Sequence, residues 1–316
     1  MKIKQLGKDG PWLSEIGLGT WAIGGPWEWG WGPQNDQESI QAIHKGLDYG
    51  INWIDTAAAY GLGHAEEIIA KALKGNRQKV FLATKCGLVW DDNGKVSNNI
   101  QPESILKEAE DSLRRLKTDY LDLYQIHWPD GKTPIEDSWA AFIRLKEQGK
   151  IRYPGVSNFG VDLLARCESI AHVNSLQPPY SLLDRHIEKD ILPWCQKQGV
   201  GIVAYSPLQS GLLTGKFNKS KLAKDDWRIR GKYFKEPWFS KNLQFAVELR
   251  TIASRYNKSL IHLAIAWVLM NQVVSSAIVG VRCVNQVEEM MGSADWELKK
   301  EDLQEIEKIR NKIFSE

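Results

Sequence analysis

The sequence predicts an α/β protein, namely a (β/α)8 TIM barrel with an N-terminal β-hairpin and extra C-terminal helices. Three observations favour this fold. Eight short apolar runs alternate with segments of helical periodicity. The apolar runs show little polar alternation, as expected of parallel strands that are buried on both faces. The composition does not change along the 316 residues, so we expect a single domain over 1–316.

An open doubly wound sheet is the alternative architecture. Such a sheet binds dinucleotides through a GxGxxG turn after its first strand. The corresponding stretch in this chain, Gly17-Leu18-Gly19-Thr20-Trp21-Ala22, lacks the third glycine. The closed barrel is therefore the preferred prediction.

The chain begins with the hairpin and the first barrel strand. Residues 2–6 and 13–16 flank the turn Asp9-Gly10-Pro11 and are predicted to pair with each other. The next apolar run, 16–21, is expected to be the first strand of the barrel. The loop 24–33 that follows it is too rich in Gly and Pro for regular structure.

The next unit shows the pattern that the rest of the chain repeats. Asp36 is expected to cap a helix, and the apolar run 51–54 then predicts a buried strand. Asp55 ends this strand, and Tyr60 lies on the small-residue turn before the following helix. Gly75 is placed as the C-terminal cap of that helix. An acid therefore ends the strand, and a phenol lies on the adjacent loop.

Two further units place a basic residue at the strand end. The strand 80–84 ends on Lys85, and the strand 120–126 ends on His127. A helix with regular apolar spacing separates them. The segment Thr133-Pro134-Ile135-Glu136 is predicted to be a capping box, with proline at the first helical position.

The remaining units continue the alternation of strands and helices. The expected strands are 153–156, 174–176, 201–204 and 276–279. The expected helices are 161–170, 190–198, 242–256, 259–271, one from residue 285 and one at 303–313. The segment 208–240 is long, basic and aromatic, and we interpret it as a lid or binding loop.

The composition argues against several classes of function. The net charge is only +2, without a basic stripe or an acidic tail, so nucleic acid and membrane surfaces are not expected partners. The four cysteines lie far apart without a CxxC pair, which argues against a metal site or a disulfide framework. The chain has no apolar leader and no run of 18 apolar residues. We therefore expect a soluble, cytoplasmic protein.

Polar residues fall repeatedly at the carboxyl ends of the predicted strands. In a barrel these ends converge on one mouth, where active sites are found. The residues expected there are Asp55, Lys85, His127, Ser157, Asn158, Gln177, Tyr205 and Arg282, with Tyr60 on an adjacent loop. Each one alone has a structural explanation, such as a buried ion pair for Asp55 and Lys85. The set as a whole favours an active site.

Four of these residues suit the donation of a proton to a developing oxyanion. The Lys85 ammonium is expected to lower the pKa of Tyr60, and Asp55 to hold Lys85 charged. His127 is expected to orient a carbonyl oxygen towards the phenol. This arrangement fits a carbonyl that receives a hydride, which a nicotinamide must supply. The residues suited to bind its carboxamide or stack on its ring are Ser157, Asn158, Gln177 and Tyr205.

Several motifs lie along the whole chain. They are Asp55-Thr56-Ala57-x-x-Tyr60-Gly61, Lys85, Asp119-Tyr120-Leu121-Asp122-Leu123-Tyr124-Gln125-Ile126-His127, Gly155-Val156-Ser157-Asn158-Phe159, Gln177, Tyr205-Ser206-Pro207-Leu208 and Gly211-Leu212-Leu213-Thr214-Gly215-Lys216. Together they resemble the aldo-keto reductases. Within this family the chain is similar to the bacterial general-stress and inositol-operon-type reductases, and more distantly to the potassium-channel β subunits.

The resemblance implies that Asp55, Tyr60, Lys85 and His127 form a catalytic tetrad, with Tyr60 as the acid in reduction. It also implies that Ser206, Leu208 and Gly211 line the pyrophosphate of the cofactor. The full set of expected cofactor contacts is Gly19, Thr20, Trp21, Ser157, Asn158, Gln177, Tyr205, Ser206, Pro207, Leu208, Gly211, Lys216, Gly280, Arg282, Gln286 and Glu289.

The last cofactor stretch departs from the commonest family pattern. Gly280 stands where members usually have a lysine, and Met290 where they have an asparagine near the adenine. Arg282 matches the subgroup in which an arginine takes the 2′-phosphate, and an arginine fork suits that group. NADPH is therefore the expected cofactor, while use of NADH and a purely surface role for Arg282 stay open.

Several of the 14 tryptophans lie beside the predicted mouth, and others are expected to pack in the core or on the surface. Aromatic walls bind the apolar faces of substrates, including sugar rings. The tryptophans expected in the substrate pocket are Trp21, Trp27, Trp90 and Trp128.

Three functions remain open at this point. The leading hypothesis is an NADPH-dependent oxidoreductase that acts on a small aldehyde, ketone or sugar. The second is a barrel aldolase in which Lys85 forms a Schiff base. The third is a non-enzymatic NADPH-sensing subunit. The sequence does not decide the oligomeric state.

Overall fold

The computed structural model describes residues 1–223 and 226–315. The barrel strands are β3 (Ile16–Gly19), β4 (Trp53–Asp55), β5 (Phe81–Cys86), β8 (Leu121–Ile126), β9 (Ile151–Ser157), β10 (Ser175–Gln177), β11 (Gly201–Ala204) and β12 (Val274–Gly280). The α-helices are α1 (Asp36–Asp48), α2 (His64–Ala72), α3 (Pro102–Leu116), α4 (Ile135–Glu147), α5 (Val161–Glu168), α6 (Ile191–Gln198), α7 (Trp238–Ser254), α8 (Leu260–Leu269), α9 (Val284–Met291) and α10 (Lys300–Phe314).

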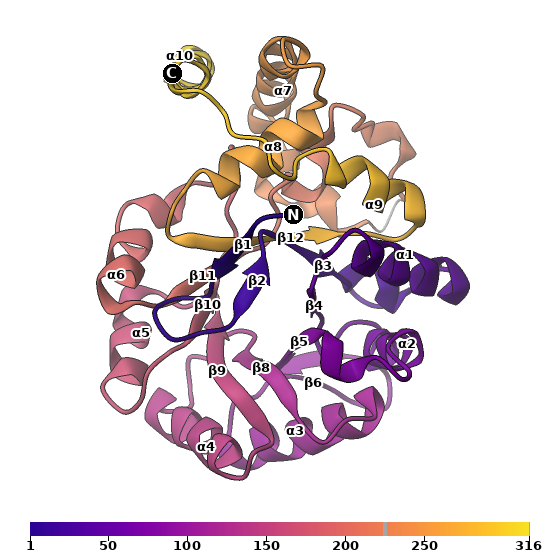
Figure 1. Cartoon of the computed structure of the whole chain (residues 1–316), viewed down its shortest axis with the longest axis vertical. Coiled ribbons are helices and arrows are strands. Elements are labelled where there is room, and N and C mark those ends of the chain that lie inside the picture. The colour runs from indigo at the N-terminus through magenta and orange to yellow at the C-terminus, as the bar shows by residue number, and fades with distance from the viewer. Residues whose placement is uncertain (224–225, 316) are drawn as a thin grey trace.

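The barrel strands form one closed parallel sheet in the order β10-β11-β12-β3-β4-β5-β8-β9. The helices surround this sheet as an outer layer (Figure 1). The predicted (β/α)8 barrel is therefore confirmed, and its strands deliver all their carboxyl ends to one side. None of the helices in the described part of the chain is long and apolar enough to cross a membrane.

The predicted N-terminal hairpin is present as β1 (Ile3–Gln5) and β2 (Trp12–Ser14). Leu6, directly after β1, and Leu13, within β2, are buried in one cluster with inward-facing residues of the barrel strands. The hairpin lies across one end of the barrel (Figure 1). That end of the interior is therefore filled by apolar side chains.

Trp53 is the largest side chain of this interior cluster, and it is fully buried. Its indole nitrogen donates to the Ser276 hydroxyl at 3.0 Å. A Cβ atom at Gly17 would lie 2.1 Å from the indole ring. Gly17 is thus required by the close approach of Trp53 to the backbone of the first strand.

Three capping predictions are wrong. The C-terminal cap of α2 is Leu73, and Gly75, with φ 79°, lies two residues beyond it. The cap of α1 is Asn35, whose side-chain oxygen accepts from the backbone N–H groups of Gln37 and Glu38, so Asp36 is already the first helical residue. The capping box at Thr133-Pro134-Ile135-Glu136 does not form either. The Thr133 hydroxyl donates instead to the Asp130 carboxylate at 2.7 Å, and Pro134 becomes the cap without a side-chain bond.

Strand boundaries near the mouth also differ from the prediction. The first barrel strand ends at Gly19, because Thr20 leaves the extended conformation with φ −111° and ψ 11°. The Thr20 hydroxyl and N–H both donate to the Asp55 carbonyl. A short 3-10 helix, η1 (Trp21–Gly24), follows. Lys85 lies inside β5, and the segment after β5 contains the hairpin of β6 (Leu88–Trp90) and β7 (Val96–Asn98).

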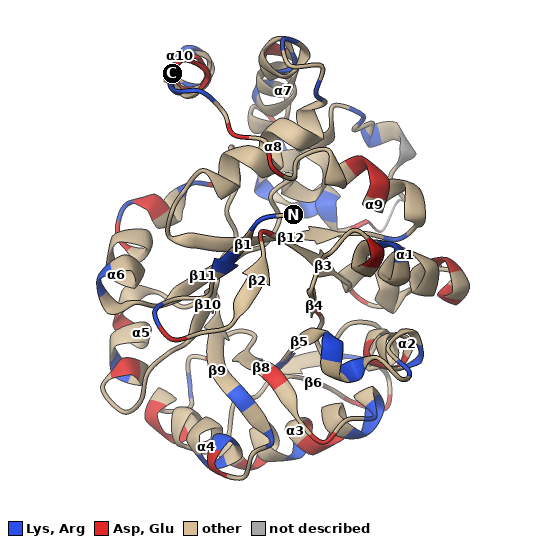
Figure 2. Cartoon of the chain, in the orientation of Figure 1, with Lys and Arg blue, Asp and Glu red and all other residues tan. Residues whose placement is uncertain are grey.

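The segment 208–240, which the sequence suggests to be a lid or binding loop, is largely irregular in the part that the structure describes. Its described part contains four short 3-10 helices and the start of α7. These are η4 (Gln209–Thr214), η5 (Lys219–Lys221), η6 (Trp227–Arg230) and η7 (Lys232–Phe234). Elsewhere the outer helices carry basic and acidic residues in mixture (Figure 2).

A buried carboxyl group on α3 gives the first testable prediction. Glu108 accepts from the Gly87 N–H at 2.9 Å and from the Ser104 hydroxyl at 3.0 Å. Burial raises the pKa of Glu108 from 4.5 to about 7. The folded state therefore binds more protons than the unfolded state between these values, and stability decreases as the pH rises through this interval, by at most ~3 kcal/mol.

We expect Glu108→Gln to raise the free energy of unfolding at pH 8 relative to wild type, and to change it little at pH 4.5. Urea unfolding at both pH values measures this difference. An equal effect of the substitution at both pH values would contradict the assignment.

Candidate active site

Asp55, Lys85 and Tyr60 form a buried cluster at the carboxyl ends of β4 and β5. The Lys85 ammonium donates to both carboxylate oxygens of Asp55, at 2.9 and 2.7 Å. It also donates to the Thr56 carbonyl at 2.7 Å and lies 3.2 Å from the Tyr60 hydroxyl. All three side chains are at most 8% exposed. The structure thus brings together the acid, the amine and the phenol expected from the sequence.

The two-residue period of the strands places these side chains inside the barrel. Trp53 and Ala83 point into the interior cluster. Asp55 and Lys85 lie two residues further along the same strands, and therefore on the same inward face. The parallel register pairs Asp55 with Ala83, so that Lys85 rises one pleat above the acid.

Tyr60 reaches the cluster from the loop after β4. Its backbone N–H donates to the Ala57 carbonyl at 3.1 Å, which makes a tight turn. The next residue, Gly61, has φ +61°, and a Cβ atom there would lie 1.9 Å from the Gly24 carbonyl oxygen. This glycine therefore permits the close approach of the two loops that bound the mouth.

His127 lies next to the phenol. Its ring meets the Tyr60 ring edge to face, with 5.8 Å between centroids and 74° between the planes. Burial and the Lys85 charge hold the pKa of His127 well below its ordinary value of 6.5, although part of the side chain is accessible. The imidazole is therefore neutral at pH 7 and can donate one N–H to an oxygen.

The predicted direction of the Tyr60 pKa is wrong. Burial, with a further contribution from the Asp55 carboxylate, raises this pKa well above 10. The Lys85 charge is balanced by Asp55 in direct contact, so its field at the phenol does not offset the loss of water. Burial likewise lowers the pKa of Lys85, against the opposing effect of Asp55. Tyr60 is consequently held as a protonated phenol.

The polar residues at the carboxyl ends of β9, β10 and β11 are linked to one another and to the cluster. Gln177 donates its side-chain amide to Asp55 at 2.7 Å. The Ser157 hydroxyl donates to the Gln177 carbonyl at 2.8 Å, and Asn158 donates to the His127 carbonyl at 3.0 Å. The Tyr205 hydroxyl donates to the Asn158 side-chain oxygen at 2.8 Å. Strand ends on both sides of the mouth are therefore joined by hydrogen bonds.

The loop after β11 has an unusual backbone. Ser206, Gln209 and Ser210 have φ between 45° and 56°, in the left-handed region that non-glycine residues seldom adopt. Gly211 follows with φ 99°. Such unfavourable backbone conformations persist where the surrounding structure holds the backbone in one conformation, which is common at functional sites. Pro207 and Leu208 lie in the same turn, so the segment expected at the pyrophosphate is a preformed loop.

Arg282 and its neighbours lie just beyond β12. The Arg282 side chain donates to the Gln34 side-chain oxygen and to the Pro33 carbonyl, both at 2.7 Å. The Arg282 N–H donates to the Gln286 side-chain oxygen at 2.8 Å. Gly280 is exposed, with no atom of the described residues within 4 Å of a Cβ placed there.

Two other residues near this stretch are engaged with other parts of the protein. Lys216 forms an ion pair with Glu289, which joins the loop after β11 to α9. Met290, in the position where the family commonly has asparagine, is 1% exposed and belongs to the core. Its burial explains why an apolar residue is tolerated there.

The tryptophans expected in the pocket have different surroundings. Trp21 stacks over Tyr60 with centroids 6.3 Å apart and 17° between planes, and Trp27 lies 6.0 Å from the same ring. Trp90 is half-buried, with the Arg115 guanidinium 5.8 Å from its ring. Trp128, directly after His127, is 45% exposed. Two of the four therefore contact the phenol.

Sequence reasoning missed Trp227 and Arg228. Trp227 stacks on Trp21 with centroids 5.5 Å apart, extending the column that begins at Tyr60. Arg228 donates to the Ser210 carbonyl at 3.3 Å and lies 4.9 Å from the Trp31 ring centroid. The segment around η6 thus bridges the first and seventh loops of the mouth. Only its basic and aromatic composition could have indicated this.

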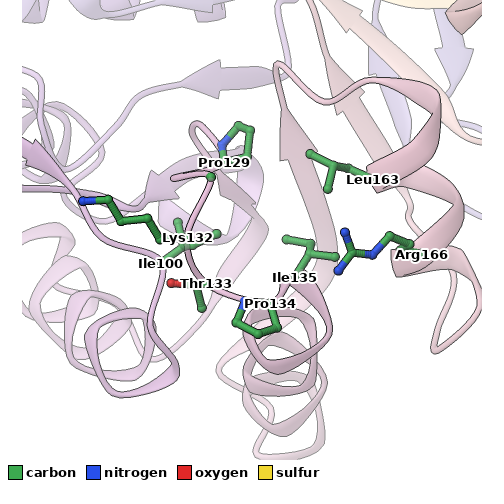
Figure 3. Close-up of a pocket in the computed structure, with 9 residues that line it drawn as sticks. Ile100, Pro129, Lys132, Thr133, Pro134, Ile135, Leu163 and Arg166 are labelled. Atoms are coloured by element: carbon green, nitrogen blue, oxygen red, sulfur yellow. The ribbon is translucent and has the colours of Figure 1, made fainter.

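A separate pocket of about 300 Å³ lies beside the mouth, between the loop after β8 and α5 (Figure 3). Its lining includes Ile135 and Leu163, with the Arg166 guanidinium at the edge. Arg166 is paired with Glu136 at 2.7 Å. None of the site residues expected from the sequence lines this pocket.

Comparisons with known proteins agree with this geometry. The family model described as "Aldo/keto reductase family" matches residues 15–311. The chain is 39% identical to the aldo-keto reductase YhdN of Bacillus subtilis (strain 168), over 100% of this chain and 96% of that protein. It is 35% identical to the NADH-specific methylglyoxal reductase of Escherichia coli (strain K12), over 96% of both proteins.

The structure is similar to a solved glycerol dehydrogenase from Gluconobacter oxydans. The TM-score is 0.90 and the sequence identity 41%, over 99% of this chain and 96% of that chain. The family match covers nearly the whole barrel, including every strand end of the mouth. The chain therefore belongs to the aldo/keto reductase family, whose members are oxidoreductases that use nicotinamide cofactors.

Proposed function

We propose that the protein is an NADPH-preferring oxidoreductase that interconverts a small aldehyde, ketone or sugar and its alcohol, with Tyr60 as the proton donor in reduction. The observation that carries this proposal is the contact of 3.2 Å between the Tyr60 hydroxyl and the Lys85 ammonium. It lies at the mouth of the barrel, where this fold places its chemistry.

The residues of the mouth fit a dinucleotide phosphate. The loop of left-handed residues from Ser206 to Gly211 supplies a fixed backbone surface, and such surfaces suit pyrophosphate. The Arg282 guanidinium is bonded only to neutral oxygens, and no carboxylate of the described residues pairs with it. Its charge is thus available to a phosphate, which supports NADPH.

A reduced nicotinamide, when bound, supplies the hydride. The chain supplies the rest of the chemistry. The neutral His127 imidazole orients the carbonyl oxygen by donating a hydrogen bond to it. Tyr60 then gives that oxygen its phenolic proton as negative charge develops there. Lys85, held by Asp55, stabilises the phenolate that remains.

The tryptophans at the mouth support a small, oxygen-rich substrate. The indole N–H groups of Trp21, Trp27 and Trp227 are buried without an acceptor in the part of the chain that is described. The face of an indole ring packs on C–H groups, while a buried indole N–H requires a hydrogen-bond acceptor such as an oxygen. Methylglyoxal and glycerol, named for two of the similar proteins, have this character.

One similar protein, the methylglyoxal reductase, is NADH-specific, so the cofactor preference of this chain depends on its own residues. Arg282 favours NADPH because it offers a fork of donors to a 2′-phosphate. Gly280 stands where family members usually have a lysine, so this region of the chain carries one cation fewer. We therefore propose a preference for NADPH rather than exclusion of NADH.

Two other hypotheses are less well supported. A Schiff-base aldolase needs a neutral, mobile Lys85, whereas this amine donates to Asp55 and to the Thr56 carbonyl. Borohydride trapping of a carbonyl substrate on Lys85 would favour the aldolase. A non-enzymatic sensing subunit would bind NADPH without multiple turnovers.

The direct test follows the absorbance of NADPH, and separately of NADH, with a panel of small aldehydes, ketones and sugars. We expect many turnovers with at least one small carbonyl compound and a lower KM for NADPH than for NADH. Binding of NADPH without turnover of any member of the panel would contradict the proposal.

The raised Tyr60 pKa predicts opposite pH profiles for the two directions. Reduction needs the protonated phenol, so kcat should change little from about pH 6 to about pH 9. Oxidation needs the phenolate as a base, so kcat should rise with pH, by up to about tenfold per pH unit below the pKa. Initial rates of both reactions with one alcohol and carbonyl pair measure this. A reduction rate that falls steeply below pH 8 would contradict the assigned proton donor.

A further inference from the structure

Gln34 and Arg282 form a reciprocal pair across the first and last loops of the mouth. The Arg282 Nε group donates to the Gln34 side-chain oxygen at 2.7 Å. The Gln34 side-chain nitrogen donates back to the Arg282 carbonyl at 2.8 Å. One glutamine side chain therefore fixes both the backbone and the guanidinium of an arginine that lies 248 residues away in the sequence.

Gln34 is itself held in place. Its nitrogen also donates to the Ser39 hydroxyl at 3.0 Å, and Ser39 is fully buried in α1. The neighbouring Pro33 carbonyl accepts a second bond from the Arg282 guanidinium. The orientation of the guanidinium is thus set by the segment that enters α1, and not by α9 alone.

The partners of Arg282 orient its charge without neutralising it. An arginine side chain has five N–H donors, and the bonds to Gln34 and Pro33 use two of them. The acidic residues of α9 are engaged elsewhere, since Glu288 pairs with Lys45 at 2.9 Å and Glu289 pairs with Lys216. The remaining donors of Arg282 are available to an anion.

We propose that Gln34 is a positioning residue that sets the preference for a 2′-phosphorylated adenosine by holding Arg282 oriented and uncompensated. This inference rests on the proposed NADPH preference and names the residue that controls it. A neutral amide at position 34 permits phosphate binding. A carboxylate in the same place would pair with Arg282 and repel the phosphate.

The test compares Gln34→Glu and Gln34→Met with wild type and with the control Gln37→Glu. Gln37 lies on the exposed first turn of α1, and the control adds the same charge three residues away. Calorimetry measures the dissociation constants of 2′,5′-ADP and 5′-AMP, and then of NADP⁺ and NAD⁺. These binding readouts do not depend on turnover, and the paired ligands differ only by the 2′-phosphate.

We expect Gln34→Glu to weaken binding of 2′,5′-ADP and NADP⁺ by on the order of 10- to 100-fold, and to leave binding of 5′-AMP and NAD⁺ unchanged. Gln34→Met should weaken binding of the two 2′-phosphorylated ligands less than Gln34→Glu does, because it removes the bonds that orient Arg282 but adds no charge. Gln37→Glu should leave the ratio of the dissociation constants within each pair of ligands unchanged.

The outcomes separate this inference from the proposed function. If wild type prefers 2′,5′-ADP and Gln34→Glu keeps that preference, the role of Gln34 is refuted while NADPH use stands. If Gln34→Glu weakened the binding of ligands with and without the 2′-phosphate equally, Gln34 would have only a structural role, and this result would also overturn the inference. Absence of any preference in wild type would instead refute the proposed selectivity for NADPH.

Discussion

Replacement of Tyr60 by phenylalanine should lower kcat for carbonyl reduction by about 10²- to 10⁴-fold, the usual contribution of a positioned general acid. The phenol is the only proton donor of the tetrad that is both protonated and free of a carboxylate partner in the described structure, since Lys85 is bound to Asp55 and His127 is neutral. Cofactor binding should not change, because the substitution removes one oxygen and keeps the ring that stacks on Trp21.

The matched control is Tyr205→Phe, which removes a phenolic hydroxyl at the same mouth. That hydroxyl donates to Asn158 and lies outside the Asp55–Lys85 pair. Its loss should cost no more than about one hydrogen bond, or roughly tenfold in cofactor affinity. Stopped-flow single turnovers with both variants separate chemistry from binding. If Tyr60→Phe retained wild-type kcat, another proton donor would have to be assigned.

Replacement of Lys85 by methionine should remove activity and also destabilise the fold, by about 3–5 kcal/mol. Lys85 is 1% exposed, and its charge balances the Asp55 carboxylate at 2.7 Å. Without the ammonium, Asp55 remains a buried charge, with Gln177 as the neutral side chain still donating to it. The midpoint of urea unfolding measures the loss.

A double variant, Asp55→Asn with Lys85→Met, separates the two effects. It removes both charges, so its unfolding midpoint should return towards that of wild type. Activity should stay lost, because the phenolate formed at Tyr60 then has no adjacent cation. A double variant less stable than Lys85→Met would contradict the ion-pair account.

Most of the fold and the cluster could be predicted from local pattern. Apolar runs ending at Asp55, Lys85 and His127 identified the strands, and the barrel topology then required their ends to meet. The two-residue period also explains why these side chains point inward. The positions of these side chains are thus determined by the strands that immediately precede them in the sequence.

The remaining features depend on packing between distant segments. The stacking of Trp227 on Trp21 joins loops more than 200 residues apart, and no local pattern encodes it. The pairing of Gln34 with Arg282 has the same origin. The direction of the Tyr60 pKa was mispredicted because it depends on how completely water is excluded, which only the folded structure reveals.

The same limit applies to the caps that were predicted wrongly. Asp36 and Thr133 both have the residue types that cap helices. Asn35, one residue earlier, takes the first role, and Asp130 captures the Thr133 hydroxyl. Neighbouring side chains thus compete for one position, and propensity alone does not choose between them.

The most direct test of the account follows an isotope from the cofactor to the product. The carbonyl held by His127 and Tyr60 should receive its hydrogen directly, without exchange with water. With NADPH that carries deuterium at one or the other face of C4, one of the two should give an alcohol with deuterium on the former carbonyl carbon. An alcohol free of deuterium from both labelled cofactors would contradict hydride transfer at this site.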